Sequence, residues 1–183
     1  MTARFTMLKR DLLEIAGADC RTFLQGLISQ DVEKVDDKQS AYGALLTPQG
    51  KFLHDFLMIS LDSSLLLDCE AGRGEELAGR LRRFKLRADV NLELRPDLAV
   101  AAVYGEGAAQ ALEIAAVAGI TETRNGITAF VDPRTLDLGV RALGAPDDLR
   151  SLMSEHAIVE QPFEDYDQLR IRLEVPDGSR DLD

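Results

Sequence analysis

A single carboxylate interrupts an apolar strand pattern in the first half of the chain. Between Phe52 and Ile59 one row of alternate residues reads Phe, His, Phe, Met and the other reads Leu, Asp, Leu, Ile, with Asp55 in the second row. Taking an unpaired charge out of water costs several kcal/mol, so this carboxylate must find a partner, shift its pKa or meet a ligand. Asp55 is therefore the candidate catalytic residue, suited to acid-base or electrostatic chemistry.

The same pattern has a second interpretation. Asp55 can lie where the strand leaves the sheet, solvated and without a chemical role, because strands tolerate one charge near an edge. The spacing alone leaves both interpretations open.

A β-hairpin is predicted to position this carboxylate. Two apolar runs within Tyr42–Ile59 flank Thr47-Pro48-Gln49-Gly50, where proline presets one turn dihedral and glycine supplies a positive φ. A third strand at Leu65–Cys69 makes an antiparallel meander. Before the hairpin, the spacing of Cys20, Phe23, Leu24, Leu27 and Ile28 predicts one amphipathic helix.

The remaining pattern predicts an α+β fold of two similar lobes, each an antiparallel sheet with helices. We expect residues 1–95 to form the first lobe, 96–162 the second, and 163–183 a C-terminal helix and turn. The predicted strands are 12–15, 90–94, 98–104, 127–131 and 138–142, and the predicted helices are 72–85, 108–118, 147–156 and 164–173.

Charge and composition limit the partners of the chain. It has 21 Lys and Arg against 32 Asp and Glu, a formal charge of −11, which disfavours broad contact with nucleic acids or anionic membranes. The basic segment Arg80–Arg87 is either a solvated helix face or a local interaction surface. Cys20 and Cys69 have no metal-ligand spacing, so we expect no metal site. No apolar segment is long enough for secretion or a membrane span, which predicts a cytoplasmic protein.

Five segments resemble, in order along the chain, the YgfZ-type folate-binding proteins. These proteins are relatives of the glycine-cleavage T-protein, an aminomethyltransferase that uses tetrahydrofolate. The segments are Phe23–Asp31, Leu46–Asp55, Arg82–Arg87, Tyr104–Leu112 and Leu169–Leu182.

The resemblance implies a folate site that includes Tyr42, Asp55 and Arg172. The T-protein acid that matches Asp55 faces the folate and assists methylene transfer, and an aromatic residue that matches Tyr42 lines the same cavity. Apolar and aromatic walls suit the rings of folate, and one carboxylate can steer the reacting nitrogen. Tyr42 can equally be a cross-strand packing residue.

Two differences from the T-protein bear on activity. Arg172 stands where that family has the glutamate that holds the pterin, and a cation cannot accept hydrogen bonds from the donor edge of the ring. The family glycine two residues later is Glu174. The Lys-Gly-Cys motif of YgfZ-type proteins and their C-terminal β-barrel domain would follow Asp183, so we expect a piece of a longer protein that holds the folate-binding core.

The expected function is that of a tetrahydrofolate-binding accessory protein that supports iron-sulfur cluster assembly or repair, with folate and iron-sulfur client proteins as partners. One alternative is a folate-dependent aminomethyltransferase like the T-protein. If the chain is an enzyme, the resemblance implies at most a one-carbon transferase of this kind. Another is a scaffold without folate that binds proteins through surfaces such as Arg80–Arg87.

Overall fold

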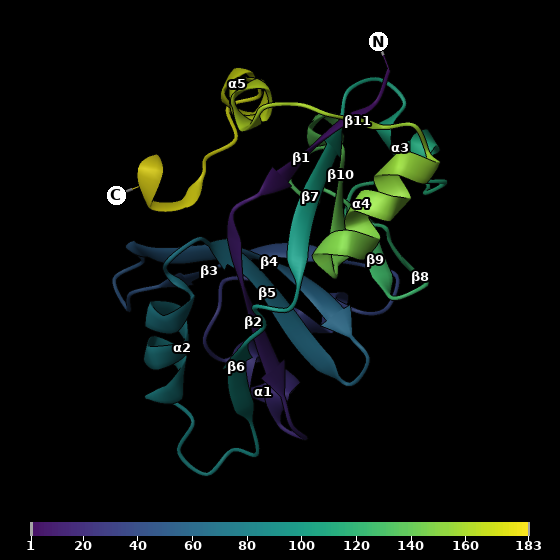
Figure 1. Cartoon of the computed structure of the whole chain (residues 1–183). Coiled ribbons are helices and arrows are strands. Elements are labelled where there is room, and N and C mark those ends of the chain that lie inside the picture. Colours follow the sequence, from purple (N-terminus) through teal and green to yellow (C-terminus); the bar gives the residue numbers. More distant parts are fainter. Residues whose placement is uncertain (1, 183) are drawn as a thin grey trace. The chain divides into compact units, whose positions relative to one another are not determined.

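The computed structural model describes residues 2–182, which form two compact units (Figure 1). One unit is built from Arg10–Pro96 and the chain from Asp177 onward, and the other from the chain up to Lys9 and Asp97–Pro176. Each unit contains one β-sheet with its own hydrophobic core. The predicted α+β class is confirmed. The predicted lobes are continuous along the chain, whereas these units exchange segments at both ends.

The five-stranded unit contains the predicted hairpin and meander. Its strand order is β3-β4-β5-β2-β6, and every neighbouring pair is antiparallel. The strands are β2 (Arg10–Ala16), β3 (Ala41–Leu46), β4 (Phe52–Leu61), β5 (Ser64–Glu70) and β6 (Asn91–Leu94). Because β3, β4 and β5 are consecutive neighbours, the carboxylate of Asp55 lies on a strand paired along both edges.

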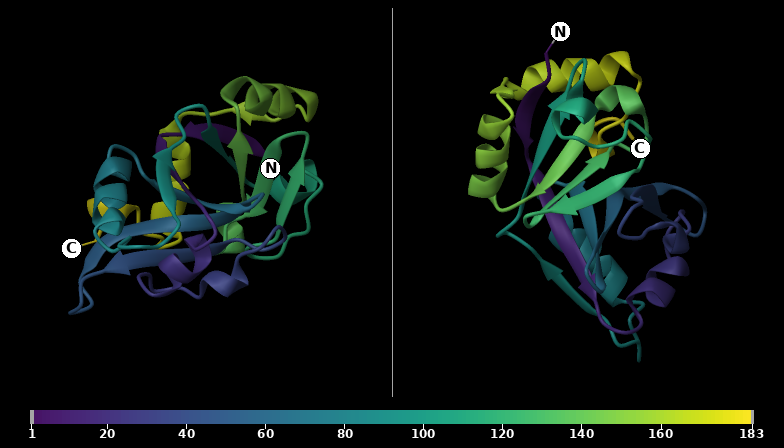
Figure 2. Two further views of the ribbon diagram at one scale, coloured as in Figure 1. Left: turned by 90° about the horizontal axis from the view of Figure 1, so that it is seen from below. Right: turned by 90° about the vertical axis from the view of Figure 1, so that its right-hand side faces the viewer.

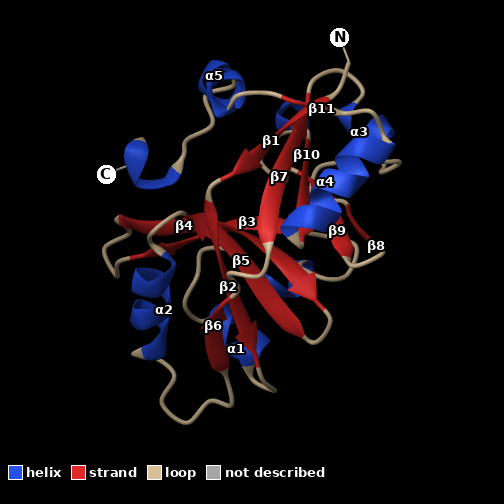
Figure 3. Cartoon of the chain, viewed as in Figure 1, coloured by secondary structure: helices blue, strands red, loops and turns tan. Residues whose placement is uncertain are grey.

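Two α-helices of the five-stranded unit, α1 (Cys20–Gln25) and α2 (Gly74–Arg82), pack on one face of its sheet (Figure 3). Two short 3₁₀ turns, η1 (Val32–Lys34) and η3 (Gly178–Arg180), complete the unit. Helix α1 is shorter than predicted. It ends at Gln25 with Gly26 as its C-cap, because the chain then turns and Ile28 forms a β-bridge with Leu45.

The six-stranded unit has the strand order β11-β1-β7-β10-β9-β8, antiparallel except for the β1 and β11 pair. The strands are β1 (Arg4–Leu8), β7 (Ala99–Tyr104), β8 (Thr121–Arg124), β9 (Ile127–Val131), β10 (Val140–Gly144) and β11 (Val159–Glu160). The sequence prediction missed β1, β8 and β11. Strand β10 begins later than predicted because Gly139 has a φ of 83° and its Cα lies against the Val103 carbonyl, where a Cβ would be only 2.2 Å away.

The helices of the six-stranded unit are α3 (Ala108–Ala111), α4 (Pro146–Glu155) and α5 (Phe163–Arg172), with the 3₁₀ turn η2 (Leu136–Leu138). Helix α4 lies along the sheet (Figure 2). Its residues Leu149 and Met153 are buried in the core of the unit. Helix α3 stops well before the predicted end at residue 118, because Glu113 takes a left-handed φ of 54°. None of the helices in residues 2–182 has the length and apolarity to cross a membrane.

A buried ionic cluster fixes the loop after β9 in the six-stranded unit. The carboxylate of Asp132, 1% exposed, accepts hydrogen bonds from the Arg134 guanidinium at 2.9 and 2.7 Å, and the Arg141 Nε lies 3.5 Å away. Burial opposes ionisation of Asp132, but the hydrogen bonds from Arg134 and the charges of both arginines outweigh it and lower the pKa of the carboxyl. The cluster therefore holds an ionised acid between two cations.

Candidate functional site

The structure brings Asp55 and Tyr42 together. Ala44 pairs with Asp55 and Tyr42 with Leu57, so both side chains lie on the same face of the β3 and β4 ladder, one step apart. The Tyr42 hydroxyl donates a hydrogen bond of 3.0 Å to Oδ2 of Asp55. Asp55 is only 6% exposed, so it is not the solvated edge residue of the alternative interpretation.

The sheet face that carries Asp55 also carries charged side chains beside Asp55 on the neighbouring strands. Leu57 pairs with Asp68, so Asp55 and Glu70 lie two residues further along their strands on the same face, and Glu70 in turn pairs with Arg10. We call Asp55, Glu70 and Arg10 the polar row. The Arg10 guanidinium also donates hydrogen bonds to the side chain and the backbone carbonyl of Asp68, which is fully buried. The row thus places two acids, Asp55 and Glu70, side by side and a base, Arg10, next to Glu70.

The segment around η3 lies over the polar row. Ser179 donates from its backbone N–H at 2.9 Å and from its hydroxyl at 2.7 Å to the two carboxylate oxygens of Glu70. Burial opposes ionisation of Glu70, but these hydrogen bonds, together with the Arg73 guanidinium, lower the pKa of its carboxyl. Asp177 lies 3.5 Å from the Arg10 guanidinium. The C-terminal segment is therefore held by both charged neighbours of Asp55.

Gly178 permits this close approach. Its φ is 53°, and a Cβ at this position would lie 2.5 Å from Oε2 of Glu70 and 3.4 Å from Oδ1 of Asp55. We expect Gly178→Ala to displace the segment from Glu70 and to raise the exchange rate of the Ser179 amide hydrogen about tenfold or more. Hydrogen exchange followed by NMR measures this rate. Gly50→Ala, at a φ of 80° but with nothing within 4 Å of the added Cβ, is the control that should leave Ser179 unchanged.

One oxygen of the Asp55 carboxylate accepts no hydrogen bond from the described residues, although Gly178 lies close to it. Oδ2 accepts from Tyr42, whereas Oδ1 has no hydrogen-bond partner among residues 2–182. A buried carboxylate that is oriented by a phenol and has one open acceptor can receive an N–H group of a flat heterocycle. The residues present therefore fit the acceptor half of a folate site.

His54 points to the opposite face of β4 and is also buried. It is 2% exposed, and its Nε2, which lies 3.7 Å from Oε1 of Glu76, has no hydrogen-bond partner within the described chain. Burial, and then the positive charge of Arg73, lower the pKa of His54 from 6.5 to about 4. The imidazole is therefore neutral near pH 7.

The buried imidazole predicts an acid-sensitive fold. Because the unfolded state binds the proton more readily, the contribution of His54 is fully present above pH 6.5 and is lost as the pH falls toward 4. Between pH 6.5 and pH 5 the free energy of unfolding should fall by about 2 kcal/mol, and His54→Gln should abolish that part of the slope. Urea titrations at a series of pH values measure it. His156→Gln, at the exposed second histidine, should keep the parental slope.

Arg172 belongs to the other unit. It is the last residue of α5 and its side chain is exposed. Its predicted part in folate binding stays a prediction.

Sequence reasoning missed Arg10, Asp68, Glu70 and Ser179. Asp68 interrupts the apolar run Leu65–Cys69 in the same way as Asp55 interrupts its strand, so the same signal could have found it. The other residues become neighbours only through sheet register and the return of the C-terminal segment, which carry no local sequence signal.

The described part of the chain offers little for metal or thiol chemistry. Residues 2–182 contain no group of three or more His, Cys, Asp or Glu side chains placed to hold a metal ion. Cys20 and Cys69 are buried free thiols, and burial raises the pKa of Cys69 to about 12, which makes it a poor nucleophile. Two cavities, of about 490 and 420 Å³, are lined by residues other than Asp55.

The amino-acid sequence of the chain is similar to those of known proteins. The chain is 34% identical over 152 residues, which is 80% of its length, to the mitochondrial iron-sulfur cluster assembly factor IBA57 homolog of Pyricularia oryzae. The chain is a homologue of the IBA57 iron-sulfur cluster assembly factors. It is also 33% identical over 100 residues to an aminomethyltransferase of Chromobacterium violaceum. The aligned region covers 54% of this chain and 28% of that protein. No family model matches.

The solved structures confirm the T-protein-like fold of this IBA57 homologue. Glycine cleavage system aminomethyltransferase T from Bartonella henselae superposes with a TM-score of 0.78 at 14% identity, over 95% of this chain and 52% of that one. The chain spans 37% of the Pyricularia oryzae relative and 52% of the human IBA57.

The prediction of a cytoplasmic protein is wrong. The IBA57 relatives from Pyricularia oryzae, Homo sapiens, Neurospora crassa and Mus musculus are all named as mitochondrial proteins. The prediction rested on the lack of a long apolar segment, which bears on secretion and membrane insertion. Mitochondrial import uses amphipathic, arginine-rich leaders instead, which that criterion does not test.

Proposed function

We propose that this chain is the folate-binding part of a protein that supports iron-sulfur cluster assembly, with tetrahydrofolate as the ligand of the Asp55 face. The observation that carries the proposal is the buried pair of Tyr42 and Asp55, whose Oδ1 accepts no hydrogen bond from the described residues, on a T-protein-like fold. The homology to IBA57 assembly factors supports the iron-sulfur role.

The roles of the residues follow from their chemistry. Oδ1 of Asp55 would accept a hydrogen bond from a ring N–H of folate, while the Tyr42 hydroxyl holds the carboxylate in place. The cation of Arg172 suits a carboxylate better than the donor edge of a pterin, and its part in folate binding stays a prediction. When bound, tetrahydrofolate supplies a carrier for one-carbon units.

Titration calorimetry of the intact chain with tetrahydrofolate tests the ligand. We expect saturable heat with one site, and a T-protein serves as the positive control. Binding to the control but not to this chain would remove the folate part of the proposal. Loss of iron-sulfur enzyme activity in cells that lack the gene, with restored activity on re-expression, tests the assembly role separately.

Aminomethyl transfer is a second candidate function, favoured by the similarity to the Chromobacterium violaceum aminomethyltransferase. In this case Asp55 would act as the acid-base or electrostatic residue, and Asp55→Asn should lower turnover about 100-fold or more with an intact fold. A glycine-cleavage assay with the other components supplied measures turnover. Equal rates in parent and variant would rule this function out.

A further inference from the structure

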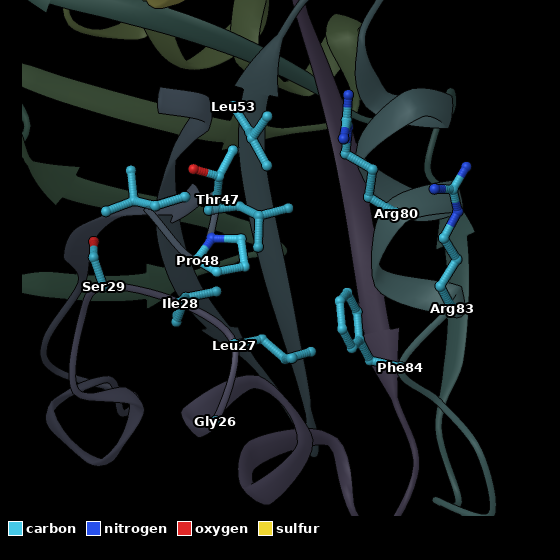
Figure 4. A pocket seen from close by; sticks show the side chains of 12 residues that line it. Gly26, Leu27, Ile28, Ser29, Thr47, Pro48, Leu53, Arg80, Arg83 and Phe84 are labelled. Atoms are coloured by element: carbon cyan, nitrogen blue, oxygen red, sulfur yellow. The ribbon is translucent and has the colours of Figure 1, made fainter. Parts of the chain in front are cut away.

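A groove with a volume of about 490 Å³ lies in the five-stranded unit between the β3–β4 hairpin turn and the end of α2 (Figure 4). In Figure 4 the Phe84 ring stands on the α2 side and faces Leu27 and Leu53 across the groove, and Arg80 and Arg83 extend from the same side. The apolar part of its lining includes Leu27, Ile28, Leu45, Pro48, Leu53 and Phe84. The groove is thus an apolar trough with cations along one wall.

Its large apolar side chains are unusually open to water. Phe84 is 54% exposed and Leu46 is 39% exposed, and both line the groove. Leu86, two residues after Phe84, is 92% exposed and has a left-handed φ of 45°. Contiguous exposed apolar surface is typical of interaction sites, and Phe84 and Leu46 share one concave surface with further apolar side chains.

The cations of the basic segment Arg80–Arg87, two of which (Arg80 and Arg83) line the groove, are only partly neutralised. Arg80 and Arg82 form ion pairs with Glu76 and Glu75 on α2. Arg83, Lys85 and Arg87 have no carboxylate partner among residues 2–182. In a chain with a formal charge of −11, this makes a local positive surface that complements an acidic partner.

We propose that this groove docks an acidic segment of a partner protein, which inserts one apolar side chain opposite Phe84 and places carboxylates against Arg83. An apolar anchor flanked by complementary charge is the usual composition of a protein hot spot. Nucleic acid fits less well, because its backbone needs a continuous cationic track and an overall attractive charge. The groove is separate from the Asp55 site, so the proposal does not depend on folate binding.

Fluorescence polarisation with four fluorescein-labelled peptides tests the proposal on the intact chain. Each peptide carries one central Phe, Leu, Ile or Met with two glutamates on either side. We expect saturable binding of at least one peptide below about 1 mM, and a loss of about tenfold or more in affinity when the glutamates become glutamines or the central residue becomes serine. No saturable binding by any of the four peptides overturns the proposal.

Variants locate the binding. Arg83→Glu and Phe84→Ser change exposed side chains and should each weaken binding about tenfold or more while the circular dichroism spectrum stays unchanged. Lys38→Glu makes the same change of charge at an exposed position of the same unit and should change affinity less than about twofold. Equal binding by Arg83→Glu and the parent, or preferential binding of single-stranded DNA, overturns the proposal. So does a dimer in sedimentation that Arg83→Glu disrupts, because a second copy would then fill the groove.

Discussion

Asparagine in place of Asp132 should lower the free energy of unfolding by about 3 to 5 kcal/mol, the usual cost of breaking a buried ion pair on one side. The substitution keeps the shape of the side chain but leaves the buried Arg141 and the half-buried Arg134 without the carboxylate between them. Because single domains are stable by only about 5 to 15 kcal/mol, the six-stranded unit would be close to unfolding. Urea denaturation followed by circular dichroism measures the change.

An exposed ion pair in the same unit supplies the control. Glu160 lies 3.4 Å from Arg150, and both side chains are more than half exposed. Glu160→Gln should therefore cost less than about 1 kcal/mol. Equal losses in the two variants would show that burial of Asp132 does not matter.

The pH dependence gives an independent check on Asp132. Its folded-state pKa is lowered, so the carboxylate contributes stability above its unfolded pKa, and this contribution is lost as the pH falls below about 4. The variant should therefore lose less stability than the parent over this acid range. A parallel acid limb in both proteins would contradict an ionised Asp132 in the fold.

Tetrahydrofolate should bind Asp55→Asn about tenfold to a hundredfold more weakly than the parent, if the proposed function holds. A hydrogen bond to a charged group contributes about 1.5 to 3 kcal/mol, and the amide keeps the size of the side chain while it loses the charge. The Tyr42 hydroxyl can still donate to the amide oxygen, so the local packing should persist. Calorimetry reports the affinity, and circular dichroism verifies the fold.

Asp62→Asn is the matched control for this loss of charge. Asp62 is exposed in the turn between β4 and β5 and has a φ of 50°, a left-handed conformation that asparagine also accepts. Its affinity for tetrahydrofolate should equal that of the parent. Tight binding by Asp55→Asn, with the Asp62→Asn control unchanged, would move the ligand away from the Asp55 face.

The sequence predicted the elements whose signals are local. The Thr47-Pro48-Gln49-Gly50 turn and the alternation of β4 placed the hairpin correctly, and the interrupted apolar row pointed to a carboxylate that proves to be buried. The helix ends were predicted too late. The β-bridge of Ile28 with Leu45 ends α1, and the left-handed backbone of Glu113 ends α3, while the apolar spacing continues past both ends.

Pairings between distant segments could not be predicted. Strand β1 gains its place only by pairing with β7, and the two-residue β11 only by pairing with β1. In the candidate site, Ser179 meets Glu70 across 109 residues of chain. No short window of sequence contains both members of such a pair. A contact of this kind therefore produces no periodic pattern of residues from which it could be predicted.

The exchange of segments between the units determines the order in which the polypeptide can fold during synthesis. Strand β1 leaves the ribosome early but cannot pair until β7 has been synthesised. The five-stranded unit can form its sheet before Asp177 and Ser179, the partners of Arg10 and Glu70, have been synthesised. The face that carries Asp55 is therefore uncovered in every nascent chain until translation passes Ser179, and a ligand present in the compartment would meet it open during that interval.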